Sequence, residues 1–150
     1  FRISRSATMK APAETIFAEV NDFHRWKNWS PWAKLDPNAK ETFSGPDSGM
    51  GAIFHWDGNK EVGEGEMQIT EVRTNELILI KIDFFKPFKG TNTVEFNFKT
   101  EGELTTVTWS MYGKSSFIGK AIGLIMNCDK MIGDMYEKGL TSLKAIVETP

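Results

Sequence analysis

The sequence has one cysteine, no long apolar run and no block of a single charge sign. The lone cysteine, Cys128, excludes an intramolecular disulfide and a metal site built from several cysteines. No apolar run approaches the roughly 18 residues that a membrane-spanning helix needs. The 18 basic and 20 acidic residues are spread along the chain, which gives a formal net charge of −2. We therefore expect no nucleic-acid partner.

Phenylalanine and tryptophan are abundant, whereas tyrosine is scarce. The 150 residues include 11 Phe and 5 Trp but only 2 Tyr. Because phenylalanine has no polar tip, this bias favours a dry interior over a hydrated interface. With no linker or repeat, we expect a single domain over residues 1–150. The sequence begins at Phe1 and not at a methionine, which leaves open a preceding signal or membrane anchor, and with it the compartment.

The first 37 residues predict a strand followed by two short helices. Residues 2–10 alternate apolar and polar side chains, as a half-buried strand does. Pro12 then suits the first position of a helix, where its missing N–H costs nothing. The Asn-Asp pair at 21–22 can cap a second helix, which ends before Pro31 because the residue preceding a proline avoids the helical region. We expect residues 32–37 to form a loop.

The middle of the chain predicts a meander of six strands over residues 40–112, separated by glycine- and asparagine-containing turns. Val94, Phe96 and Phe98, for example, alternate with polar neighbours. Such alternation indicates a sheet with one hydrated and one apolar face. Only helices remain to cover the apolar face.

The C-terminal region predicts one long helix from Ser115 or Ser116 to about Val147. Its apolar residues recur in steps of three and four and form a single stripe. A helix of about 30 residues spans ~45 Å, enough to lie across a whole sheet. Cys128 falls on the stripe, where we expect a buried and inert thiol.

This order of elements is similar to the helix-grip fold of the START-like superfamily, also called SRPBCC, and most of all to its polyketide cyclase/dehydratase-like branch. The resemblance covers essentially the whole chain and implies an α+β fold. In that fold a seven-stranded curved antiparallel sheet wraps around the long C-terminal helix, with two short helices after the first strand. The residues that carry the resemblance are APAETIF (11–17), NWSPW (28–32), GAIFHW (51–56), Asn59, EVGEG (61–65) and TVTW (106–109).

The resemblance further implies an apolar cavity between sheet and helix. The glycines Gly63 and Gly65 within a predicted strand would curve the sheet or leave volume open. The alternative is a solid core, because protein interiors are normally close-packed. The candidate ligand-binding residues are those expected to face inward: Phe54, Trp56, Met67, Ile69, Ile80, Phe84, Phe96, Phe98, Trp109, Met111, Ile125, Ile132 and Met135.

Three tryptophans, Trp26, Trp29 and Trp32, are the candidate cavity entrance. The first two share a helix face at a spacing of three residues. They could guide an apolar ligand into the cavity or present a surface to another protein. The alternative is that they close the end of the core, because large aromatic side chains are mostly buried.

The sequence predicts no catalytic residue, no metal site and no cofactor. Two distant histidines, His24 and His55, do not make a ligand set for a metal. Most carboxylates of the middle strands alternate with apolar residues, so we expect them on the hydrated face. An enzyme would need a polar group inside the cavity with a perturbed pKa. The groups to inspect are Asp57, Asp83, Asp129 and Tyr136.

The favoured function is binding or transport of a small hydrophobic ligand, such as a lipid, fatty acid or polyketide-like molecule. A cyclase- or dehydratase-type enzyme acting in the same cavity is the alternative, and a protein-interaction module is the third. Membrane contact would come through a segment preceding Phe1. The oligomeric state is left open.

Overall fold

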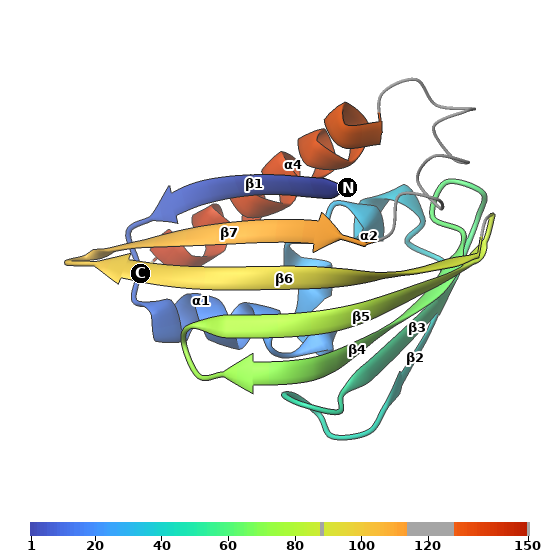
Figure 1. Cartoon of the computed structure of the whole chain (residues 1–150), viewed down its shortest axis with the longest axis horizontal. Helices are drawn as coiled ribbons and strands as arrows, with labels where there is room; N and C mark the ends of the chain where they lie inside the picture. Colours follow the sequence, from blue (N-terminus) through green and yellow to red (C-terminus); the bar gives the residue numbers. More distant parts are fainter. Residues whose placement is uncertain (88, 114–127, 150) are drawn as a thin grey trace.

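The computed structural model describes residues 1–87, 89–113 and 128–149 (Figure 1). The chain order is β1 (Arg2–Met9), α1 (Ala13–Val20), the 3-10 helix η1 (Phe23–Asn28), α2 (Trp32–Leu35), β2 (Lys40–Ser44), β3 (Ile53–Asp57), β4 (Glu64–Arg73), β5 (Leu77–Lys86), β6 (Gly90–Glu101), β7 (Leu104–Tyr112) and α4 (Cys128–Glu148). Among the described residues, no helix is long and apolar enough to cross a bilayer.

The strands form one seven-stranded antiparallel sheet in the order β1-β7-β6-β5-β4-β3-β2. The predicted meander is confirmed, because β2 to β7 follow one another across the sheet. The first strand pairs with the last, so that Arg2 lies opposite Tyr112 and Met9 opposite Thr105. Three hydroxyl pairs link these two strands: Ser4 with Ser110, Ser6 with Thr108, and Thr8 with Thr106, at 2.8 to 3.0 Å.

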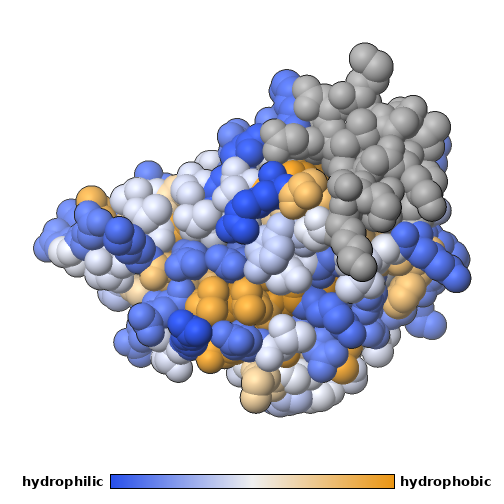
Figure 2. Space-filling model, viewed as in Figure 1, coloured by the Kyte–Doolittle hydropathy of each residue, from blue (hydrophilic) through white to orange (hydrophobic). Residues whose placement is uncertain are grey.

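The sheet curves and has a concave and a convex face. On β6 the buried side chains alternate with exposed or half-buried ones, as the sequence predicts. The helices lie on the concave side, behind the sheet in Figure 1. The convex face is mostly hydrophilic, with an apolar patch over β5 (Figure 2), where Leu77 and Leu79 are the outward-facing residues.

The helices cover the concave face over β1, β7 and β6. The chain of α4 runs alongside β1, and α1 contacts both α4 and β6. The buried residues of α4 are Tyr136, Leu140, Leu143 and Val147, which recur at steps of three and four as the predicted stripe does. The helix-grip arrangement is thereby confirmed.

Some details differ from the sequence-based expectation: Pro12, for example, is the extended N-cap of α1 and not its first helical residue. The segment expected to be a loop after the second helix contains a helical turn, α2, whose first residue Trp32 follows Pro31. Proline is well suited to a helix start because its φ angle is already helical. The predicted beginning of the last helix at residues 115–116 lies outside the described residues, and its end falls at Glu148.

Candidate functional site

The centre of the concave face is a packed cluster of aromatic rings, which we call the aromatic core. Its members are Trp26 and Trp29 from η1 and its C-terminal end, with Phe96 on β6 and Trp109 on β7. Ring centroids lie 4.7 Å apart for Trp26–Trp29 and 5.0 Å apart for Phe96–Trp109. The indole N–H of Trp26 donates to the carbonyl of Val20 at 2.8 Å, which satisfies its polar atom inside the core.

The three predicted entrance tryptophans do not share one environment. Trp26 and Trp29 are only 7% and 2% exposed, so both belong to the core, in agreement with the alternative that they close its end. Sequence alone did not decide this point, because tryptophans three residues apart on a helix can face either solvent or the sheet. Trp32 is half-buried, with its ring 6.0 Å from Trp109 and 5.9 Å from Tyr136.

A second set of rings, which we call the aromatic row, lies over the strands farther from α4. It consists of Phe43 on β2, Phe54 and Trp56 on β3, and Phe84 on β5. Consecutive centroids are 5.2, 6.1 and 6.3 Å apart. Phe54, Trp56 and Phe84 pack against the core yet remain half-buried, and Phe43 is more exposed still. Solvent therefore reaches apolar rings on the concave side of the sheet.

The other predicted ligand-binding residues divide into three groups. Seven have less than a tenth of their surface exposed and form core: Met67, Ile69, Ile80, Phe96, Phe98, Trp109 and Met111. On α4, Ile132 and Met135 are half-buried. Ile125 lies outside the described residues. Of the predicted set, a molecule from solvent could touch these residues without displacing core side chains: Phe54, Trp56, Phe84, Ile132 and Met135.

The described part of α4 packs directly on the sheet. The ring of Tyr136 stacks on that of Trp109, with centroids 3.9 Å apart and an interplanar angle of 10°. Leu140 and Leu143 are fully buried beyond it. The expected gap between the helix stripe and the strands is therefore closed along residues 136–147.

The two glycines expected within one strand leave no empty volume, and only Gly65 lies in β4, since Gly63 precedes its first residue, Glu64. A Cβ atom at Gly65 would overlap the ring of Trp56, so the missing side chain is replaced by an indole. Gly63 adopts a φ of +64°, a conformation that side chains other than glycine rarely take. The β4–β5 pairing also shifts register between Glu64 and Gly65. Gly65 thus admits the Trp56 ring, and Gly63 lets the backbone pass close to the carbonyl group of Lys86.

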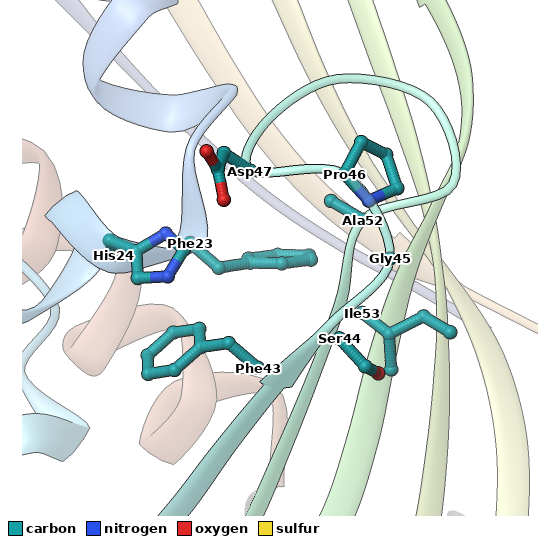
Figure 3. Close-up of a pocket in the computed structure, with 9 residues that line it drawn as sticks. All are labelled: Phe23, His24, Phe43, Ser44, Gly45, Pro46, Asp47, Ala52 and Ile53. Carbon is teal, nitrogen blue, oxygen red and sulfur yellow. The ribbon is translucent and has the colours of Figure 1, made fainter.

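Two partly open hollows stand out among the described residues, and no residue of α4 lines either of them. The first, of about 120 Å³, is bordered by the rings of Phe23, His24 and Phe43 and by the 45–47 loop (Figure 3). That volume approaches the roughly 150 Å³ that accommodates one benzene, and is well below the ~300 Å³ of a typical ligand pocket. The second, about 330 Å³, has mostly polar residues around it, including Glu14, Asp22 and Arg25, together with the apolar Phe17 and Ala18.

The carboxylates and His55 of the middle strands lie on the convex face, as the alternation predicts. Nε2 of His55 is 2.9 Å from an oxygen of Glu64, and the His55 ring stacks near Phe85. Asp83 accepts a hydrogen bond of 2.6 Å from the Thr91 hydroxyl. Asp57 is exposed at the end of β3. These groups are therefore turned away from the concave apolar face.

Tyr136 is the one candidate acid–base group that the structure places inside. Burial raises the pKa of its hydroxyl, so the group stays protonated at neutral pH. Its ring is 3% exposed and covered by Trp109, which keeps it from a reactant in this conformation. The side chain of Asp129 lies outside the described residues. Within the described ranges, no group of three His, Cys, Asp or Glu residues is placed to hold a metal ion.

One polar residue of the concave face was missed by the sequence reasoning. Asn92 precedes Val94, Phe96 and Phe98 in the same alternation, so it faces inward, and it is 3% exposed. The sequence signal was present: an amide at the first inward position of an otherwise apolar row.

A family model described as polyketide cyclase/dehydrase and lipid transport matches residues 1–148. The chain belongs to this family. The resemblance inferred from the sequence is thereby confirmed. None of the curated proteins compared with the sequence matches it.

Solved structures similar to this polyketide cyclase/dehydrase and lipid transport family member include protein CV1439 from Chromobacterium violaceum, at 14% identity and a TM-score of 0.73 over 99% of this chain and 98% of that one. A protein from Nitrosospira multiformis has 18% identity and a TM-score of 0.70, over 99% and 97% of the two chains. The Aha1 dimer from Colwellia psychrerythraea has 17% identity and a TM-score of 0.67, again over 99% and 97%. At these identities the likeness establishes the fold.

Proposed function

We propose that this domain binds a small hydrophobic molecule on the concave face of its sheet, against the aromatic row. The single observation that carries the proposal is that Phe54, Trp56 and Phe84 stay half-buried on the face that the helices cover. The convex face of the same strands carries His55, Asp57 and Asp83 beside the apolar Ile53 and Phe85. The family description, which joins polyketide cyclases with lipid transport, supports an apolar ligand in general terms.

The rings offer enough surface for useful affinity. A ligand that covers about 200 Å² of apolar surface gains about 5 kcal/mol at roughly 25 cal/mol per Å². A gain of about 5 kcal/mol corresponds by itself to a dissociation constant of about 0.2 mM, and part of it is lost to the immobilisation of the ligand, so binding weaker than micromolar is expected. The half-buried Ile132 and Met135 of α4 and Trp32 of α2 are the proposed contacts on the helical side. Of the predicted entrance residues, Trp32 is the one we retain at the rim.

The proposal is tested with a pair of neighbouring phenylalanines on β5. Phe84 belongs to the aromatic row, whereas Phe85 is 38% exposed and faces the convex side, next to His55. Binding of a fluorescent fatty acid or of anilinonaphthalene sulfonate is measured by titration, and native mass spectrometry reports molecules that copurify with the protein. We expect Phe84→Ala to weaken binding about 5- to 20-fold, because part of the apolar contact area is lost.

The matched variant Phe85→Ala should change the affinity less than twofold. Thermal unfolding of both variants establishes that each is folded before binding is compared. Absence of binding to the wild-type protein, or an equal loss in both variants, would refute the assignment of the ligand to the concave face.

A further inference from the structure

Asn92 places an amide in the apolar concave face, beside the aromatic row. On β5 its cross-strand partner is Ile82, and the next inward residue of that strand is Phe84. Diagonal neighbours on one face of an antiparallel pair have Cα atoms roughly 7–8 Å apart. The amide itself leans toward β7, where a Cβ at Gly113 would overlap Oδ1, so a ligand that joins this amide to the ring of Phe84 must reach across β6.

The described residues around the amide of Asn92 leave it incompletely hydrogen-bonded. Its nitrogen lies 4.0 Å from the sulfur of Met111, a weak acceptor. Its oxygen Oδ1 is buried and has no hydrogen-bond partner among the residues that the structure describes. Buried polar side-chain atoms are generally hydrogen-bonded, and an unsatisfied one lowers stability. An apolar residue of similar size would suit this position better if folding were the only requirement.

We infer that Asn92 is the polar anchor of the ligand site, and that the ligand is an apolar molecule carrying a hydroxyl group. This inference rests on the proposed function. The free atom is an acceptor, so the ligand must supply a hydrogen-bond donor, and a hydroxyl does so without bringing a charge into the apolar face. An ionised carboxylate carries acceptors only and would face Oδ1 unfavourably. The apolar part of the ligand then lies over Phe84 and Trp56.

The test compares three probes with the same twelve-carbon chain: 1-dodecanol, methyl dodecanoate and dodecanoate. Each displaces a fluorescent reporter from the protein at pH 8, below the critical micelle concentration of the probes. For the wild-type protein we expect the alcohol to bind about 10-fold more tightly than the ester, the size of one net hydrogen bond to a buried group. Dodecanoate should bind more weakly than the alcohol.

The decisive variant is Asn92→Leu, with Asn97→Leu as its matched control. Asn97 is on the same strand but exposed on the convex face, where it donates to Glu95. In Asn92→Leu the preference for the alcohol should fall below twofold, while the ester binds as well as before or more tightly. In Asn97→Leu the 10-fold preference should persist.

The melting temperature of the variants tests the role of Asn92 without any ligand. Because Asn92→Leu removes an unsatisfied amide, we expect its melting temperature to equal or exceed that of the wild-type protein. Gly113→Ala is the second variant, since its new Cβ would overlap Oδ1 of Asn92 and displace the amide. It should reduce the preference for the alcohol while keeping residue 92 unchanged.

Each possible result separates this inference from the proposed function. Binding of all three probes with equal affinity, unchanged in Asn92→Leu, would overturn the role of Asn92 and leave hydrophobic binding intact. A preference for the ester or the carboxylate, or a marked loss of stability in Asn92→Leu, would also overturn it. No binding of any probe to the wild-type protein would refute the proposed function and the inference together.

Discussion

We predict that Gly65→Ala destabilises the domain, because the Trp56 ring packs against Gly65 where a Cβ atom would lie. A methyl group at residue 65 would overlap the six-membered ring of Trp56 and lie 2.7 Å from the carbonyl oxygen of Asp83. The indole could turn aside, but the carbonyl belongs to the backbone of β5. That strand is held by its pairing with β4 on one side and β6 on the other.

The expected size follows from two opposing effects. Overfilling a packed site costs about 1–3 kcal/mol. Replacing glycine by alanine also restricts the unfolded chain, which offsets about 0.4–1 kcal/mol. We expect a net loss of about 1–2 kcal/mol in the free energy of unfolding. For a chain of this length that corresponds to a fall in melting temperature of about 2–8 °C.

Urea unfolding followed by far-ultraviolet circular dichroism measures this loss, and a double-mutant cycle assigns it to the ring. In a Trp56→Leu background the overlapping ring atoms are gone, so Gly65→Ala should cost at least about 1 kcal/mol less. Gly102→Ala is the matched control, because a Cβ at Gly102 meets nothing within 4 Å and only its φ of +61° opposes the change. Its cost should be independent of residue 56. A neutral Gly65→Ala, or the same cost in both backgrounds, would refute the reasoning.

Two further predictions concern buried hydroxyl groups. Thr105→Val removes the 2.8 Å hydrogen bond from a fully buried hydroxyl to the carbonyl of Ala11. We expect the free energy of unfolding, measured in urea, to fall by about 1–2 kcal/mol. A change under about 0.3 kcal/mol would contradict this. Burial raises the pKa of Tyr136, so above pH 10 ionisation of this tyrosine favours the unfolded state. The wild-type protein should then lose stability relative to Tyr136→Phe by up to ~1.4 kcal/mol per pH unit. Parallel stability profiles of the two proteins against pH would contradict this.

The sheet could be predicted from the sequence because alternation is a local property. Val94, Phe96 and Phe98 specify by their spacing which face of β6 is buried, and the structure follows. The same reasoning placed His55 and Asp83 on the convex face. Turns with glycine or asparagine then divided the meander at the right places.

The side chains that fill the space on the concave face could not be predicted, since their packing depends on contacts between elements far apart in the sequence. Nothing local in the sequence shows that the space beside Gly65 is filled by Trp56, or that Trp26 and Trp29 pack on Trp109. Asn92 is a different case. Its inward position follows from the alternation on β6, although polar residues are more often exposed.

The pairing of β1 with β7 has a consequence for how the protein folds during its synthesis. The two strands lie at opposite ends of the sheet-forming sequence, so Arg2 can pair with Tyr112 only after residue 112 has been synthesised. At a synthesis rate of about 5–20 residues per second, β1 is made several seconds before β7, which is its neighbour in the sheet of the described residues. Contacts this far apart along a chain also form slowly. Nascent chains will therefore carry an unpaired β1, and the sheet can close only after the chain has been made as far as Tyr112.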